Sequence, residues 1–164
     1  MHFEQALKNP IFKTIASCAA ELEIPCYVVG GYVRDFILCR DAGQDIDIVA
    51  IGNGIELAES VAKALPNAPK VSIFKTYGTA MLRFKGIDLE FVGARKESYK
   101  KESRNPEICE GTIEDDQKRR DFTINALAIS LNTSDYGTLL DPFNGMADLK
   151  NKRIVTPLNP NLTF

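Results

Sequence analysis

Two aspartates separated by one residue are the side chains in this sequence best suited to chemistry. Asp45 and Asp47 lie in the stretch DIDIVA (45–50), where acidic and apolar residues alternate. A period of two is typical of a strand, so both carboxylates should share one face, roughly 6.7 Å apart along the backbone. Two convergent carboxylates can bind Mg²⁺, which prefers oxygen ligands, and paired ions can clamp the attacking and leaving oxygens of a phosphoryl transfer. D-x-D also occurs on ordinary solvated strands, which is the alternative interpretation.

A glycine pair precedes the aspartates and could hold phosphate. Gly30 and Gly31 lie between a predicted strand and a predicted helix. Free N–H groups at a helix start attract anions, and glycine lets a ligand approach the backbone closely. Arg34, three residues further on, can point back toward the same end of the helix. The alternative is a tight turn followed by a solvated arginine.

The elements that must position these residues follow from apolar periodicity and from Gly and Pro breaks. Helices are predicted over residues 7–22, 32–38, 55–65, 113–125 and 146–150. Strands are predicted over residues 26–29, 45–50, 70–75, 79–84, 87–92, 126–131, 138–140 and 153–155. Gly86 lies where a hairpin turn needs a glycine, and the charged segment 97–112 is expected to be a mobile loop. The fold class expected is α+β, with a central twisted sheet that carries helices mainly on one side.

The composition limits the partners of the chain. It has 164 residues, which suits one domain or one domain with a short extension, and 45% of them are hydrophobic. The formal net charge of −2 argues against a surface that coats nucleic acid over the whole molecule. Basic residues cluster locally, in segments 95–104 and 118–120, so any nucleic-acid contact should be focused there or lie in parts of a larger protein.

The four cysteines, Cys18, Cys26, Cys39 and Cys109, form no C-x-x-C pair, and His2 is the only histidine. A zinc site is therefore not expected. The first ten residues carry charges and lack the apolar core of a signal peptide, and no apolar run is long enough to span a membrane. We expect a cytoplasmic protein with reduced thiols and no membrane partner.

Five motifs, in order, give the chain a resemblance to a known family. The first is VGGYVRD (29–35) followed by DID (45–47). The others are YGT (77–79), LEFVGARKESY (89–99), RRDFTINAL (119–127) and LDPFNGMADL (140–149). Together they resemble the signature of class II tRNA nucleotidyltransferases and bacterial poly(A) polymerases. Chance similarity across five ordered motifs is far less frequent than across any one of them. The resemblance implies a polymerase β-like nucleotidyltransferase fold, with a mixed central sheet flanked by helices.

The resemblance also implies roles for individual residues. Asp45 and Asp47 would hold catalytic Mg²⁺, and Glu90 is a candidate third catalytic carboxylate that could instead only support the site. The residues implied to bind nucleotide are Gly30, Gly31, Arg34, Arg119, Arg120, Asp121 and Asn125.

Other interpretations of single residues stay open. Asp35 is better explained by an ion pair or a backbone cap than by a metal. Asp121 could be an ion-pair partner of Arg119 or Arg34. The helical spacing of Phe122, Ile124 and Leu127 favours packing in the core over stacking on a base.

The implied organisation is an N-terminal helix (1–25), a catalytic head domain (26–156) and the start of a linker to an absent neck domain (157–164). The implied function is addition of CCA to tRNA 3′ ends, with CTP and ATP as substrates and base selection by the neck. Poly(A) polymerase or partial CC- or A-adding activity is an alternative within the same chemistry. A non-catalytic nucleotide- or RNA-binding module is an alternative of another class. The pattern predicts no oligomeric state.

Overall fold

The computed structural model describes residues 2–41, 43–98 and 107–158. Within these residues one seven-stranded sheet forms in the order β3-β4-β5-β2-β1-β8-β9. Its strands are β1 (Cys26–Val29), β2 (Asp45–Ala50), β3 (Val71–Phe74), β4 (Thr79–Phe84), β5 (Ile87–Gly93), β8 (Ala128–Ser130) and β9 (Leu139–Leu140). β2 and β5 pair in parallel, and the other neighbours pair antiparallel. This mixed sheet confirms the expected fold class.

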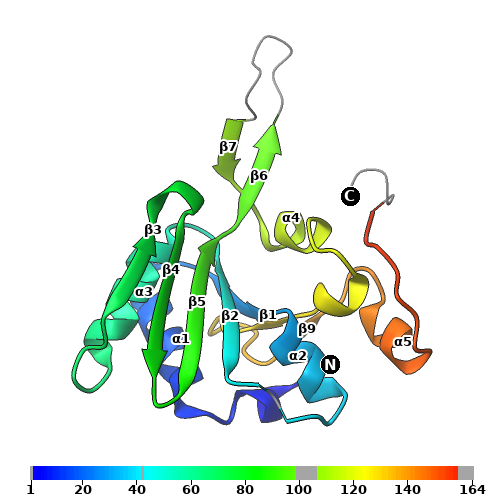
Figure 1. Ribbon diagram of the computed structural model, residues 1–164, viewed down its shortest axis with the longest axis horizontal. Helices are drawn as coiled ribbons and strands as arrows, with labels where there is room; N and C mark the ends of the chain where they lie inside the picture. The colour runs from blue at the N-terminus through cyan, green and yellow to red at the C-terminus, as the bar shows by residue number, and fades with distance from the viewer. Residues whose placement is uncertain (1, 42, 99–106, 159–164) are drawn as a thin grey trace.

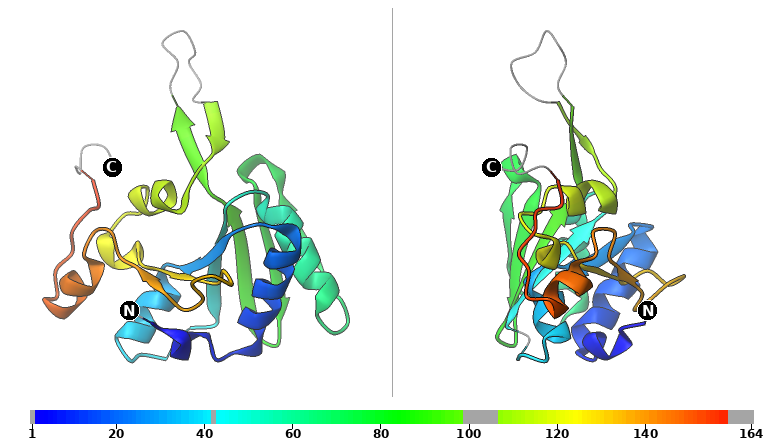
Figure 2. Two further views of the ribbon diagram at one scale, coloured as in Figure 1. Left: turned by 180° about the vertical axis from the view of Figure 1, so that it is seen from behind. Right: turned by 90° about the vertical axis from the view of Figure 1, so that its right-hand side faces the viewer.

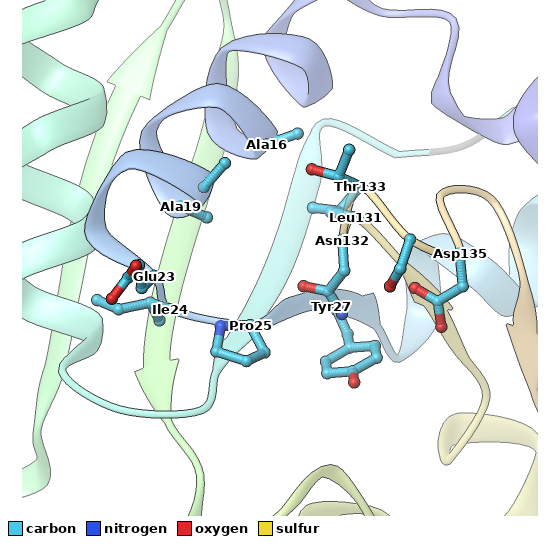
Figure 3. A pocket seen from close by; sticks show the side chains of 12 residues that line it. Ala16, Ala19, Glu23, Ile24, Pro25, Tyr27, Leu131, Asn132, Thr133 and Asp135 are labelled. Carbon is cyan, nitrogen blue, oxygen red and sulfur yellow. The ribbon is translucent and has the colours of Figure 1, made fainter.

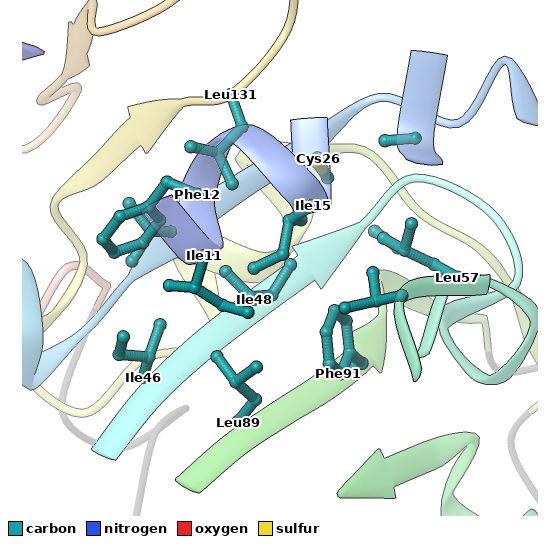
Figure 4. Close-up of a cluster of buried hydrophobic side chains, with 14 of the residues drawn as sticks. Ile11, Phe12, Ile15, Cys26, Ile46, Ile48, Leu57, Leu89, Phe91 and Leu131 are labelled. Atoms are coloured by element: carbon teal, nitrogen blue, oxygen red, sulfur yellow. The ribbon is translucent and has the colours of Figure 1, made fainter. Parts of the chain in front are cut away.

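Two helices cover one face of the sheet. α1 (Pro10–Leu22) and α3 (Gly54–Ala64) lie behind the strands in Figure 1 and in front of them when the molecule is seen from behind in Figure 2. The apolar side chains of β2 and β5 meet these helices in the main core, where Ile48, Leu89 and Phe91 are fully buried (Figure 4). These residues alternate with the acidic residues of the same strands, so the acidic residues face the opposite side.

The opposite face is covered only at one end. A smaller core of Val29, Val49, Ala94, Ile113 and Ala128 lies there, with α4 (Ile113–Lys118) contributing Ile113. The shorter helices α2 (Gly31–Ile37) and α5 (Gly145–Lys150) lie at the same end of the sheet (Figure 1). The expectation of helices mainly on one side is therefore correct for α1 and α3 but does not describe α4.

The N-terminal helix starts later than its apolar stripe predicts. Leu7 belongs to a separate 3₁₀ turn, η1 (Glu4–Leu7), and α1 begins at Pro10. Asn9 caps the helix by accepting a hydrogen bond from the Ile11 N–H at 3.0 Å, and proline is favoured at the first helical position. The helix stops at Glu23, whose φ of 55° lies in the left-handed region.

The expected hairpin turn at Gly86 is confirmed. Lys85 and Gly86 join β4 to β5 with φ values of 47° and 79°. Two positive φ angles are typical of the tight turns that match the twist of a hairpin, and glycine adopts them without steric cost.

The prediction of a loop over residues 97–112 is wrong for its described part. β6 (Arg95–Ser98) pairs antiparallel with β7 (Glu107–Glu110), and this hairpin projects from the body in Figure 1. The charged composition favours a loop. Antiparallel pairing joins the backbone N–H and C=O groups of the two strands whatever their side chains are, so composition does not reveal it. Residues 99–106, which include Tyr99 and part of the basic segment, lie outside the described residues.

The helix expected over residues 113–125 is also wrong beyond Lys118. Thr112 starts α4 with a capping box to Asp115, but the helix ends after six residues. Asp121 then accepts a hydrogen bond from the Phe122 N–H at 2.8 Å, just before the 3₁₀ turn η3 (Thr123–Asn125), whose N-cap is Phe122. Such local side-chain bonds compete with helix, and the apolar period could not reveal them. Of the three apolar residues predicted to be core here, only Leu127 is fully buried.

The end of the described chain contains no strand over residues 153–155, contrary to prediction. The segment is held by two backbone bonds, from the Thr123 N–H to the Val155 carbonyl and from the Arg153 N–H to the Asp148 carbonyl, each at 2.8 Å. Before it, Asp141 caps α5 by accepting bonds from the N–H groups of Gly145 and Met146. Most of the expected linker, residues 159–164, lies outside the described residues. Among the described helices, none combines the length and the apolar character needed to cross a membrane.

Candidate nucleotidyl-transfer site

The uncovered face of the sheet carries a row of acidic side chains. Asp47 on β2 lies beside Glu90 on β5 and beside Val29 on β1. Asp45 lies one row along the same face, opposite Asp88. Asp45 is exposed and Asp47 and Glu90 are partly buried. Parallel pairing of β2 with β5 thus brings together three acidic residues that the sequence implied for one site.

The glycine turn lies directly beside Asp47. Gly30 ends β1 with a φ of 76°, and α2 begins at Gly31. A β-carbon at Gly30 would lie 3.4 Å from Asp47 Oδ2 and 3.5 Å from a terminal guanidinium nitrogen of Arg120. A side chain here would also be strained by the positive φ. Gly30 therefore leaves open the small space in which the aspartate and the arginine converge.

Arg34 is held in place by two partners. Its Nε lies 3.0 Å from Asp35 Oδ1, and another of its guanidinium nitrogens donates to Asn125 Oδ1 at 2.8 Å. Asn125 in turn donates to Asp121 Oδ1 at 3.2 Å. Asp35 therefore pairs with a cation, which was the alternative favoured for it. A guanidinium fixed by two oxygens still presents donors to a phosphate.

Arg120 reaches the site from the turn just after α4, and Asp116, which no sequence motif includes, positions it. The Arg120 Nε donates to Asp116 Oδ2 at 3.1 Å. Only 9% of the Asp116 side chain and 26% of the Arg120 side chain are exposed. The signal was present, because an acid and an arginine four residues apart on a helix are neighbours. Asp116 is absent from the family motifs, because the motif RRDFTINAL begins only at Arg119.

The other implied nucleotide-binding residues are placed less centrally. Arg119 is exposed, and its backbone N–H bonds to the Asp116 carbonyl at the end of α4. The Asp121 carboxylate accepts bonds from the Phe122 N–H and the Asn125 amide, so it shapes the turn that holds Asn125. The suggested ion pairs of Asp121 with Arg119 or Arg34 are replaced by these contacts.

The electrostatics of the acidic row favour a cation. Burial raises the pKa of Asp47; Arg120 lowers that pKa, and Asp45 and Asp116 raise it. Burial also raises the pKa of Glu90, and Asp47 raises it further while Arg120 lowers it. Both carboxylates are thus less stable as anions than in water, because they are partly desolvated and near other negative charges. A bound cation would offset both the desolvation of these carboxylates and the repulsion from the neighbouring negative charges.

The described side chains include no preformed cluster of three or more His, Cys, Asp or Glu residues that could hold a metal ion. Mg²⁺ does not need such a cluster, because it is often bound by one or two carboxylates together with waters and substrate phosphates. Asp45 and Asp47 supply two hard oxygen donors on one face beside arginines suited to phosphate. The residues present therefore fit the implied ion.

A separate pocket of about 500 Å³ lies between the end of α1 and the segment 131–135 (Figure 3). None of the implied site residues lines it. Its wall contains alanines of α1 together with Tyr27, Asn132 and Asp135. It lacks arginine and lysine, so it does not suit a triphosphate.

Comparison with known proteins assigns the part of the chain that carries the acidic row and the glycine turn to one family. Residues 26–155 match the family described as poly A polymerase head domain. The A-adding tRNA nucleotidyltransferase of Aquifex aeolicus is 44% identical over 134 residues, which are 82% of this chain and 16% of that protein. A solved structure of a tRNA nucleotidyltransferase complexed with a primer tRNA and an incoming ATP analog has a TM-score of 0.76 at 40% identity, covering 88% of this chain and 39% of that one.

A structure of a CCA-adding enzyme with ATP has a TM-score of 0.77 at 38% identity, covering 93% of this chain and 34% of that one. The chain therefore spans between 16% and 39% of the length of these three proteins. Its sheet and helices have the nucleotidyltransferase fold of these structures.

Proposed function

Because the chain belongs to the family of poly A polymerase head domains, we propose that it is the catalytic head of a template-independent tRNA nucleotidyltransferase. The reaction would transfer CMP and AMP from CTP and ATP to the 3′ end of tRNA. The observation that carries this proposal is that Asp47 and Arg120 both approach Gly30, 3.4 Å and 3.5 Å from where a β-carbon of that residue would lie. The similar proteins with tRNA, ATP or CCA addition in their names support the substrates.

The proposed division of roles follows the geometry. Gly30 and Gly31 leave room for the triphosphate to approach the backbone, and Arg34 and Arg120 bind its oxygens with planar, permanently charged groups. Magnesium held by Asp45 and Asp47 would supply charge neutralisation at the attacking hydroxyl and the leaving pyrophosphate. Glu90, beside Asp47, would hold the negative potential that keeps a cation in this row. Positioning and charge then account for the catalysis, because phosphoryl transfer asks little covalent chemistry of the protein.

The extent of nucleotide addition is a finer question within the same proposal. One relative is named for adding A and one structure for adding CCA, and both share similar identity with this chain. The head residues therefore do not separate CCA addition from CC, A or poly(A) addition. We propose that the base is selected by a neck domain and that residues 157–164 lead toward it.

A non-catalytic binding module is the main competing function. The paired positions Asp47 and Glu90 are intact, and so are the partly buried contacts of Arg34 and Arg120, which favours an enzyme. The test is single-turnover transfer of labelled nucleotide to tRNA that lacks its terminal nucleotides. Asp47→Asn should lower the rate by at least about 100-fold, the scale on which one lost electrostatic group in a phosphoryl- or acyl-transfer site reduces turnover.

A matched control for that test is Glu59→Gln, which removes one negative charge from the exposed side of α3 on the covered face of the sheet. This control should transfer nucleotide at the wild-type rate. Transfer by Asp47→Asn at the rate of the control would refute the proposed site.

We further propose that the protein works in the cytosol with Cys18, Cys26 and Cys39 reduced. These three cysteines are free thiols in the structure. Burial raises the pKa of Cys26 to about 12, so its thiolate is scarce and the thiol is inert at neutral pH.

A further inference from the structure

An exposed apolar surface adjoins the acidic row on the uncovered face of the sheet. Phe74 on β3 is 46% exposed, Met81 on β4 is 38% exposed, and Tyr77 in the turn η2 (Lys75–Tyr77) is 65% exposed. Large apolar side chains that gather beside a functional site indicate a binding surface more often than scattered ones do. In Figure 1 no described helix lies in front of β3, β4 and β5. We call Phe74, Tyr77 and Met81 the apolar platform.

The strand register makes the platform a continuation of the acidic row. Asp47 pairs with Glu90, and Glu90 pairs with Met81 on the next strand. Phe74 pairs with Thr79, one row further along the same face. With strands roughly 4.8 Å apart, Met81 lies about 10 Å and Phe74 about 14 Å across the sheet from Asp47. The row thus runs from acidic to apolar without a break.

The two sides of Asp47 differ in chemistry. On one side lie the glycine turn and Arg120, which suit the triphosphate. On the other side lie Glu90 and then the platform. In-line transfer requires the attacking hydroxyl and the leaving pyrophosphate on opposite sides of the reacting phosphorus. If pyrophosphate leaves toward the glycine turn, the hydroxyl must arrive from the side of β5 and β4.

We propose that the platform binds the single-stranded 3′ end of the acceptor RNA, with the terminal nucleoside over Met81 and the preceding bases against Phe74 and Tyr77. This inference rests on the proposed function, since it takes the hydroxyl of that RNA as the attacking group. Aromatic side chains stack on any base, so this surface supplies affinity and position but not sequence selection. Its role is distinct from that of the arginines that bind nucleotide.

The charges around the platform suit one RNA strand. Arg83 on β4 is exposed and faces the same side, where it lies 3.8 Å from Asp88. Arg95, at the other end, approaches the turn that carries Tyr77: a β-carbon at Gly78 would lie 3.0 Å from its guanidinium. Lys75 is exposed in the same turn. These cations flank an apolar strip, which is the arrangement that combines backbone phosphates with stacked bases.

The experiment compares substitutions of Phe74 with a matched control in the full-length protein. Ile73 is the control, because it is 40% exposed on the same strand but points to the opposite face. We expect Phe74→Leu to raise KM for a tRNA ending in C-C by about 5- to 150-fold, the range for loss of one base–aromatic stack. KM for ATP should stay within about twofold, and Phe74→Tyr, which keeps a ring, should behave like the wild type.

A second readout reports stacking without turnover. 2-Aminopurine placed at the penultimate nucleotide of the tRNA should be quenched when wild-type protein or Phe74→Tyr binds, and less so with Phe74→Leu. Ile73→Ala should match the wild type in both measurements. Equal effects of Phe74→Leu and Ile73→Ala on KM for tRNA, or an effect on KM for ATP alone, would overturn the inference.

Failure of the proposed function gives a different result. In that case the wild type would transfer no nucleotide and would equal Asp47→Asn, whatever the fluorescence shows. Normal wild-type transfer together with unchanged quenching in Phe74→Leu would leave the catalytic assignment standing and remove only the platform. If the platform is instead covered by another part of the protein, Phe74→Leu would lower the melting temperature while KM for tRNA stayed at the wild-type value.

Discussion

Removing the charge of Asp116 should slow nucleotide transfer although this residue is not expected to touch substrate. The Asp116 carboxylate is 9% exposed and holds Arg120, and a terminal guanidinium nitrogen of Arg120 lies 3.5 Å from where a β-carbon of Gly30 would be. In Asp116→Asn the charge of Arg120 still assists its hydrogen bond, but the attraction between opposite charges is lost, which contributes up to about 1 kcal/mol in partly exposed pairs. Asp116→Asn keeps an acceptor, so it should cost about 1 kcal/mol, or about fivefold in kcat/KM for the nucleotide.

Asp116→Ala should cost more, because it leaves Arg120 without its partner. Removing one member of a fully buried ion pair costs about 3–5 kcal/mol. Arg120 is 26% exposed, so water screens part of that loss. We expect about 2–3 kcal/mol, which is about 30- to 150-fold in kcat/KM.

The assay is steady-state transfer to tRNA with the nucleotide concentration varied. Glu114→Gln is the control, because it removes an equal charge from an exposed position of the same helix. A double-mutant cycle tests the mechanism: in an Arg120→Ala background, Asp116→Asn should cause almost no further loss.

Two results would refute this reasoning. One is an undiminished effect of Asp116→Asn in the Arg120→Ala background, which would show that Asp116 acts independently of that arginine. The other is a fall in kcat/KM that the Glu114→Gln control shares, which would assign the effect to the net charge of α4.

Two further predictions concern stability. Burial raises the pKa of Asp47 above its unfolded value of 3.8, so ionisation of this carboxyl destabilises the native state as pH rises through 3.8 and upward. In metal-free buffer, Asp47→Asn should therefore melt at a higher temperature than the wild type at pH 7, and this difference should vanish below pH 3.8 and shrink when Mg²⁺ is added. A lower melting temperature of Asp47→Asn at pH 7 would contradict this. A β-carbon at Gly145 would collide with the Thr123 carbonyl oxygen, so Gly145→Ala should cost about 1–3 kcal/mol and lower the melting temperature by roughly 2–12 °C. The control Gly43→Ala, whose nearest neighbour would be 4.0 Å away, should melt like the wild type. Equal melting of the two variants would show that α5 can shift.

Local patterns were enough to predict the strands next to the chemistry. The bounds of β1 and β2 agree with the predicted ranges, because alternating apolar residues are bounded there by Pro25 and by glycines. The shared face of Asp45 and Asp47 follows from the period of a strand alone. The family resemblance added the role of Arg120, which no periodicity contains.

Local patterns failed where a distant partner decides the conformation. The predicted helix over residues 113–125 had a suitable apolar period, yet the chain turns after Lys118. Asp121 bonds to the turn itself, and Gly145 packs directly against Thr123 from a segment more than twenty residues away. Neither contact can be found from helical spacing.

The sequence by itself determined which groups are available: two carboxylates on one side of a strand, a glycine pair and arginines suited to phosphate. Only the tertiary structure decided that Glu90 lies beside Asp47, that Asp116 holds Arg120, and that Met81 extends the same row with Phe74 on the same face. The physical reason is that residue spacing sets direction within one element, whereas contact between elements depends on which strands pair and in what register. That pairing is set by burial of the whole core, to which every element contributes at once.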